Sequence, residues 1–153
     1  MLTIVLVDPK IPQNTGNIGR LCAANNVRLH LVGDIAFDLS DKYLKRAGLD
    51  YWPFLEFELF PDLDAYFSDI ETAPKHLLTT KSTRSYLDRR YSNEDYLIFG
   101  SETEGLSDTL RTRFEVDCCT IPMANPNVRS LNLANSVGIV MYGAIAQQAC
   151  SGH

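Results

Sequence analysis

The stretch IPMANPNVRSLNLANSVGIVMYG, residues 121–143, decides how the second half of this chain folds. No residue from Ser130 to Cys150 carries a charge, and the apolar residues after Ser136 surround the axis of the helix that we predict near 130–149. A helix that is apolar on every side must be buried on every side. The first turns of this helix are nevertheless polar, because they contain Ser130, Asn132, Asn135 and Ser136.

This polar start has two interpretations. Serine and asparagine are neutral or unfavourable inside a helix but favourable at its start, so we expect Ser130 to cap a helix that begins at Leu131. In the first interpretation the segment is a core helix with a polar first turn. In the second interpretation the turn belongs to a site, where buried asparagines find the hydrogen bonds that they require.

Short apolar runs rich in β-forming residues alternate with helix-like segments along the rest of the chain. The predicted strands are 2–7, 28–33, 75–80, 95–100 and 118–123, with a further short strand at 54–59. The predicted helices lie near 15–25, 40–48, 61–70, 107–113 and 130–149. This alternation is typical of the α/β class, with a mostly parallel sheet and helices on both faces. Ligands of such sheets bind beyond the carboxyl ends of the strands.

The size and hydropathy of the chain favour a single domain over residues 1–153. Hydrophobic residues make up 45% of the 153 positions, enough for a sizeable core. The opening MLTIVLVDPK lacks a basic region and a cleavage site, so it predicts a first strand and not a signal peptide. The unbroken apolar run Val137–Ala146 is too short to span a bilayer. We therefore expect a cytoplasmic protein with no membrane partner.

The cysteines and histidines do not predict a metal site. The four cysteines show no C-x-x-C spacing, and the three histidines are scattered. Cys118 and Cys119 are adjacent in a predicted strand, where their side chains face opposite ways. We expect reduced thiols that serve as small hydrophobic side chains, and no metal.

The formal net charge of −5 argues mildly against a nucleic-acid partner. Binding to RNA requires that basic residues gather on one face of the molecule. The candidates for such an RNA track are Lys42, Lys45, Arg46, Lys81, Arg84, Arg89 and Arg90.

A first polar loop, PQNTGNIGR at residues 12–20, follows the first predicted strand. It contains neither G-x-G-x-x-G nor a Walker A sequence, which excludes the usual dinucleotide and P-loop sites. We expect Asn14 to cap a helix that begins near Thr15, with Asn17 and Arg20 on one face. Arg20 either points to an anionic group at the strand ends, since guanidinium matches phosphate, or is an ordinary exposed arginine.

A second polar loop, FGSETEGLS at residues 99–107, follows the predicted strand 95–100. Gly100 and Gly105 allow the backbone to approach a ligand closely, and Glu102 can accept hydrogen bonds. The alternative is a tight turn before a helix whose dipole favours acidic residues. The two interpretations are compatible.

Taken together, these three blocks resemble the SPOUT class of S-adenosylmethionine-dependent RNA methyltransferases, in its TrmH-like branch of ribose 2'-O-methyltransferases. PQNTGNIGR is similar to the first motif of the branch, LIFGSETEGL to the second, and IPM with VRSLNLANSV to the third. RAGLDYW at 46–52 and LLTTK at 77–81 are most similar to the YibK/TrmL subfamily. The resemblance covers essentially the whole chain.

The resemblance implies a fold that the residues alone do not predict. The C-terminal part of the family forms a deep trefoil knot, here a cofactor-binding knot over approximately 75–150. The family forms homodimers packed through the knot, and Tyr142 is our candidate for an interface aromatic because it shares a helix face with Asn135, Gly138 and Ile145.

The resemblance also implies an activity. The expected reaction is 2'-O-methylation of the ribose of the wobble nucleotide of tRNA (position 34, cytidine or modified uridine), with S-adenosylmethionine as methyl donor. DNA is excluded because the acceptor is a 2'-hydroxyl. The alternatives are another tRNA position, ribosomal RNA, or a non-catalytic cofactor-binding or assembly module.

Matching the motifs residue by residue assigns two sets of site residues. The expected cofactor-binding residues are Leu78, Thr79, Gly100, Ser101, Glu102, Ile121, Met123, Ser130 and Leu131. The expected catalytic residues are Arg20, Asn14, Glu102, Ser130 and Asn132. The family assigns activation of the hydroxyl to the arginine, but arginine stays protonated, so orientation and charge stabilisation by Arg20 are at least as favoured. We hypothesise that Arg20 of one subunit approaches the cofactor of the other.

Overall fold

Residues 1–40, 42, 46 and 50–152 are described by a computed structural model, and in this part of the chain six strands form one sheet. The strand order is β3-β2-β1-β5-β4-β6, and all neighbouring strands are parallel. The strands are β1 (Thr3–Val7), β2 (Arg28–Val32), β3 (Phe57–Phe60), β4 (Lys75–Leu78), β5 (Tyr96–Phe99) and β6 (Cys118–Cys119). The predicted parallel sheet is confirmed.

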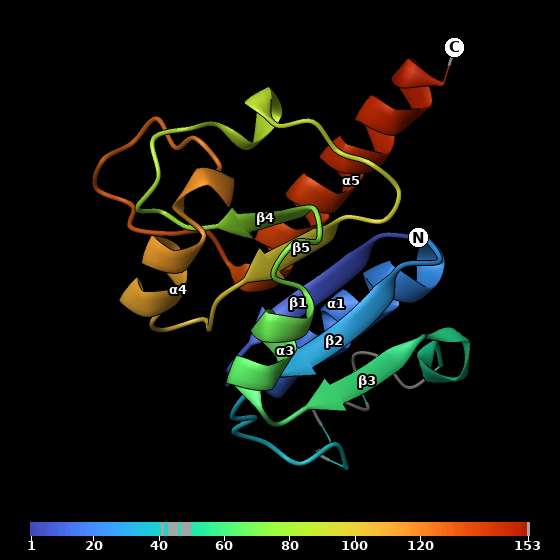
Figure 1. The fold of residues 1–153 in the computed structure, drawn as a ribbon. Helices are drawn as coiled ribbons and strands as arrows, with labels where there is room; N and C mark the ends of the chain where they lie inside the picture. The colour runs from blue at the N-terminus through green and yellow to red at the C-terminus, as the bar shows by residue number, and fades with distance from the viewer. Residues whose placement is uncertain (41, 43–45, 47–49, 153) are drawn as a thin grey trace.

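Helices cover both faces of this sheet, as predicted (Figure 1). They are α1 (Pro12–Ala24), α3 (Leu63–Asp69), α4 (Asp108–Arg113) and α5 (Leu133–Ser151), with 3-10 turns η1 (Trp52–Phe54), η2 (Tyr86–Asp88) and η3 (Glu115–Asp117). Most of the helix predicted near 40–48, Lys45 included, lies outside the described residues. The trefoil knot stays a prediction.

Strand β1 lies in the middle of the sheet and explains how the two layers form. All five of its residues are buried, which is typical of a central parallel strand. Ile4 and Leu6 pack into the core that α1 and α5 cover, whereas Val5 and Val7 pack into the core beneath α3 and α4. Alternate side chains of one strand thus supply both cores.

Helix α1 begins earlier than the sequence predicted, and Asn14 is not its cap. The helix starts at Pro12, and Ile11 at the N-cap position makes no side-chain capping bond. Proline is favourable at the first helical position because its missing N–H would have no helical partner there. Asn14 therefore lies inside the first turn, where its buried side chain is available for other contacts.

Helix α5 begins later than predicted, and Ser130 is not its cap. The N-cap is Asn132, whose Oδ1 accepts a hydrogen bond from the Asn135 N–H at 3.1 Å. Strand β6 is also shorter than the predicted 118–123. Beyond Cys119 the chain leaves β4, and Thr120 instead forms an isolated parallel bridge with Ser85.

A buried polar network connects β4 with the segment that follows η2. Asp95 lies 2.7 Å from Nε2 of His76, and Arg89 Nε donates to Nδ1 of the same ring at 2.9 Å. Because arginine can only donate, Nδ1 is the acceptor and His76 is neutral, with its proton on Nε2. Arg89 also bonds to Val116 O and Asp117. The hypothesis that Arg89 belongs to an exposed RNA track is therefore wrong.

The buried His76 and the half-buried His30 predict a loss of stability in acid. Burial lowers the pKa of His76 below its ordinary value of 6.5, and burial with the Arg28 charge lowers the pKa of His30 to about 4. Below pH 6.5 the unfolded chain therefore binds protons that the folded chain does not. The free energy of unfolding should fall by about 1.4 kcal/mol per pH unit for each histidine, which urea unfolding between pH 7.5 and 5 measures.

The variant His76→Gln provides the control, because glutamine can still donate to Asp95 but does not titrate. Its unfolding free energy should fall less steeply below pH 6.5 than that of the wild type. Equal slopes in the two proteins would contradict the assignment of His76 as a buried neutral ring.

Candidate active site

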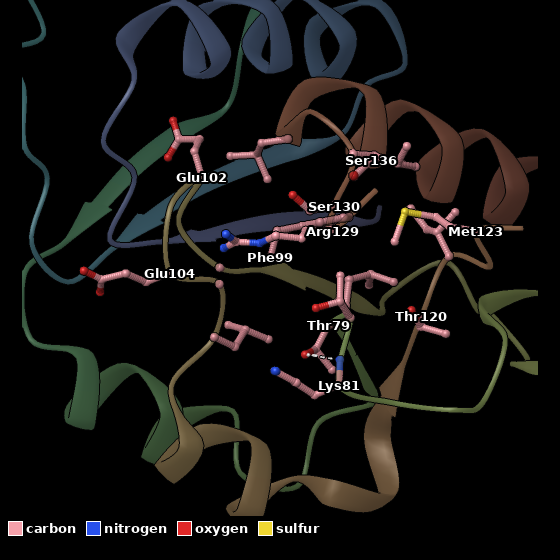
Figure 2. Close-up of a pocket in the computed structure, with 18 of the residues that line it drawn as sticks. Thr79, Lys81, Phe99, Glu102, Glu104, Thr120, Met123, Arg129, Ser130 and Ser136 are labelled. Atoms are coloured by element: carbon pink, nitrogen blue, oxygen red, sulfur yellow. Dashed lines mark hydrogen bonds between the residues drawn. The ribbon is translucent and has the colours of Figure 1, made fainter. Parts of the chain in front are cut away.

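The carboxyl ends of β4, β5 and β6 surround one cavity of about 690 Å³ (Figure 2). All nine residues expected to bind the cofactor line it: Leu78, Thr79, Gly100, Ser101, Glu102, Ile121, Met123, Ser130 and Leu131. Its volume is typical of small-molecule sites, and its place is the edge of the sheet where α/β proteins bind ligands.

The loop after β5 folds back on itself, and Gly100 makes this possible. A Cβ atom on residue 100 would lie 2.0 Å from the carbonyl carbon of Gly105 and 2.2 Å from the nitrogen of Leu106. Gly105 has a φ of +69° and donates its N–H to Ser101 O at 3.0 Å. The space beside Gly100 was expected to admit a ligand, but on its Cβ side the loop itself fills it.

The Glu102 carboxylate binds the start of α1. It accepts hydrogen bonds from the backbone N–H groups of Lys10 at 2.9 Å and Ile11 at 2.7 Å, and from Asn14 Nδ2 at 3.3 Å. Backbone N–H groups at a helix start have no helical partner, and a negative charge is favourable there. Glu102 thus provides the capping interaction that Ile11 cannot make.

Asn14 and Asn132 extend this contact to the third motif. Asn132 Nδ2 donates to Asn14 Oδ1 at 3.2 Å, while Asn132 Oδ1 caps α5. Only 7% of Asn14 is exposed. The chain of contacts Glu102–Asn14–Asn132 therefore joins the three polar blocks of the sequence beside the cavity, which supports the second interpretation of the polar start of α5. The asparagines of that start, Asn132 and Asn135, are nevertheless exposed and not buried as expected.

Three cationic side chains also line the cavity, and the sequence assigned none of them to it. They are Lys81, Arg111 and Arg129. Figure 2 shows Arg129 among the residues that line the cavity. Signals in the sequence could have indicated two of them: Lys81 follows β4 at the carboxyl edge, and Arg129 directly precedes Ser130 in the third motif. The sequence offers no such signal for Arg111.

Arg20 lies apart from the other predicted catalytic residues. Glu102 and Ser130 line the cavity, and Asn14 and Asn132 are bonded beside it, but Arg20 is not among the lining residues. It is exposed on α1, six positions after Asn14, or about 9 Å along the helix axis. One chain thus brings together four of the five expected catalytic residues.

Two kinds of site are absent from the described part of the chain. No group of three or more histidine, cysteine, aspartate or glutamate side chains there is placed to hold a metal ion. None of the helices in the same residues has the length and hydropathy needed to cross a membrane.

The two glutamates of the loop should differ in their effect on stability. Glu102→Ala leaves two backbone N–H groups and an asparagine amide without their acceptor, so the free energy of unfolding should fall by about 1–3 kcal/mol. Glu104 forms only an exposed ion pair with Lys10 at 3.2 Å. Glu104→Ala is the matched control and should cost less than about 1 kcal/mol in urea unfolding. Equal losses would refute the structural role of Glu102.

The sequence is similar over nearly its full length to proteins of one family. The SpoU rRNA Methylase family matches residues 1–142. Two relatives named tRNA (cytidine(34)-2'-O)-methyltransferase, from Burkholderia pseudomallei and Methylovorus glucosotrophus, are 39% and 40% identical to this chain. Each comparison covers 99% of this chain and 99% of the relative.

Solved structures agree with these sequence relatives. One, described as "Structural insights into the 2-OH methylation of C/U34 on tRNA", has a TM-score of 0.91 at 41% identity and covers 97% of both chains. The SpoU methyltransferase AviRb from Streptomyces viridochromogenes, solved with AdoMet, has a TM-score of 0.84 at 26% identity. That comparison covers 98% of this chain and 61% of AviRb.

Proposed function

This chain belongs to the SpoU rRNA Methylase family, and on that premise we propose that it methylates the ribose 2'-hydroxyl of nucleotide 34 in tRNA. The relatives named for this reaction match the chain from end to end. The observation that carries the proposal is the cavity at the strand ends, beside which Glu102, Asn14 and Asn132 join all three motifs. We also propose that the protein acts in the cytoplasm, which a tRNA substrate supports.

The cavity fits S-adenosylmethionine as the cofactor. When bound, this cofactor supplies a methyl group carried on a positively charged sulfur. Leu78, Ile121 and Leu131 offer apolar surface for an adenine, and the backbone at Thr79 and Ser101 offers groups that can bond to polar edges. We assign cofactor binding to the nine lining residues that the family resemblance predicted, within a knotted segment over approximately 75–150.

The task left to the protein is to position a poorly acidic hydroxyl and to assist the loss of its proton. Ser130 lines the cavity and can bond to the ribose, and Asn132 is fixed beside it by its bond to Asn14. We assign to Arg20 the orientation of an RNA phosphate and the stabilisation of negative charge, because a guanidinium matches the geometry of a phosphate.

Because Arg20 does not line the cavity of its own chain, we propose a homodimer in which Arg20 of one subunit acts at the cavity of the other. The described part of α5 exposes Ile139 and Tyr142, 39% and 49% accessible, on a helix without charged residues. A second copy of the chain can cover this apolar face. Tyr142 also accepts a hydrogen bond at 3.0 Å from Asn25, the C-cap of α1, so this face adjoins the end of the helix that carries Arg20.

The variant Asn132→Ser tests the proposed site. Serine still caps α5, but it is too short to replace the amide that reaches Asn14, so the ribose site should lose its alignment. We expect methyl transfer to nucleotide 34 of a tRNA pool to fall about 100-fold, as measured by mass spectrometry of the digested RNA. Asn127→Ser, in an exposed turn outside the lining residues, is the control and should retain activity.

Other outcomes of the same assay support the alternatives. Methylation of another tRNA nucleotide or of ribosomal RNA by the wild type would contradict the assignment to nucleotide 34. Calorimetric binding of S-adenosylmethionine without transfer to any RNA would instead favour a non-catalytic cofactor-binding module.

Coexpression of two inactive variants tests which subunit provides Arg20. If the arginine acts across the dimer, a mixed dimer of Arg20→Ala and Asn132→Ser subunits contains one intact site. Random pairing should then restore about a quarter of the wild-type activity, because half of the dimers are mixed and each has one working site. Mixed dimers without activity would show that Arg20 acts within its own subunit.

A further inference from the structure

The guanidinium of Arg20 lies over the ring of Tyr51, with Cζ 4.6 Å from the ring centroid. Tyr51 directly precedes the turn η1, and it does not line the cavity. The segment 46–52 carries part of the resemblance to the YibK/TrmL subfamily, but the proposed reaction assigns no role to its residues. Its contact with Arg20 raises the question of what the ring does for that side chain.

Tyr51 occupies the N-cap position of the turn η1, and this turn packs against α1 on one side and β3 on the other. A Cβ atom on Gly19 would lie 3.2 Å from the Trp52 ring and 3.3 Å from Leu55, so the turn packs directly on the helix backbone. The Trp52 ring also packs against Phe57 of β3, with centroids 4.8 Å apart. The tyrosine next to Trp52 is therefore held at a defined place beside α1.

An aromatic face holds a guanidinium differently from a carboxylate. In the described part of the chain, no carboxylate lies within ion-pair distance of Arg20. A carboxylate would neutralise the charge and occupy the N–H donors, whereas a ring attracts the flat face of the guanidinium and leaves its edge free. The N–H groups of Arg20 therefore remain available for a phosphate or a ribose oxygen.

The side chain of an exposed arginine must also be restrained before it can act at a site. Its long side chain has many rotamers, and a catalytic group contributes to rate only when it is held in the productive geometry. The stack on Tyr51 restricts these rotamers without using the charge.

We propose that Tyr51 is a positioning residue for the methyl transfer, which orients the Arg20 guanidinium through the face of its ring. This inference rests on the proposed function, since it concerns the same reaction and the same arginine. The proposed role of Tyr51 depends on the aromatic face of its ring and not on its phenolic hydroxyl.

The test compares Tyr51→Phe with Tyr51→Leu in methyl transfer to tRNA. Phenylalanine keeps the face and should retain activity within about twofold, whereas leucine keeps apolar bulk without the face and should lower kcat/KM about tenfold. Calorimetric affinity for S-adenosylmethionine should be unchanged in both. Phe54→Leu is the control: it removes an aromatic side chain from the same turn, one that is 77% exposed, and should leave kcat/KM unchanged.

A double variant separates positioning of Arg20 from other effects of the turn. In an Arg20→Ala background, Tyr51→Leu should cause no further loss, because the side chain that it orients is gone. The inference is overturned if leucine is as active as phenylalanine, or if the loss persists undiminished without Arg20. A wild type that methylates no tRNA would instead refute the proposed function, and the role of Tyr51 with it.

Discussion

The structure of the site depends on one carboxylate. Glu102 accepts two backbone N–H groups at the start of α1 and the amide of Asn14. Because these donors come from the first helix and the acceptor from the loop after β5, the bond joins the two halves of the chain. Asn14 then fixes Asn132, and Asn132 fixes the start of α5. Glu102 thus fixes the start of α1 and, through Asn14 and Asn132, the turn before α5 beside the cavity.

The residues assigned to the proposed reaction lie in two separate regions of the molecule. The cavity is built by the carboxyl ends of β4, β5 and β6 and by the approach to α5, all from the second half of the sequence. Arg20 lies outside it, on the exposed side of α1, where Tyr51 holds the guanidinium without neutralising it. In the proposed dimer, contact through α5 brings Arg20 of one subunit to the cavity of the other.

Much of this could be predicted from the sequence. Strand and helix periodicity predicted the parallel sheet and the edge at which the cavity lies. The family resemblance, through its motifs and the segment 77–81, predicted nine residues that line this cavity. The helix starts were predicted wrongly at Asn14 and Ser130. Local capping rules consider only nearby residues. They cannot anticipate that the N–H group of Ile11, at the N-cap of α1, donates to Glu102, 91 residues further along the chain. Arg89 was misjudged for the same reason, since its partners His76 and Asp117 are remote in sequence.

The central claim is that this chain methylates the 2'-hydroxyl of nucleotide 34 in tRNA. The most direct measurement is mass-spectrometric mapping of ribose methylation in tRNA from cells with the protein, from cells without it, and from cells in which it is restored. The account predicts that 2'-O-methylation at nucleotide 34 disappears from a subset of tRNAs without the protein and returns with it. The same methylation at nucleotide 34 in all three samples would contradict the account.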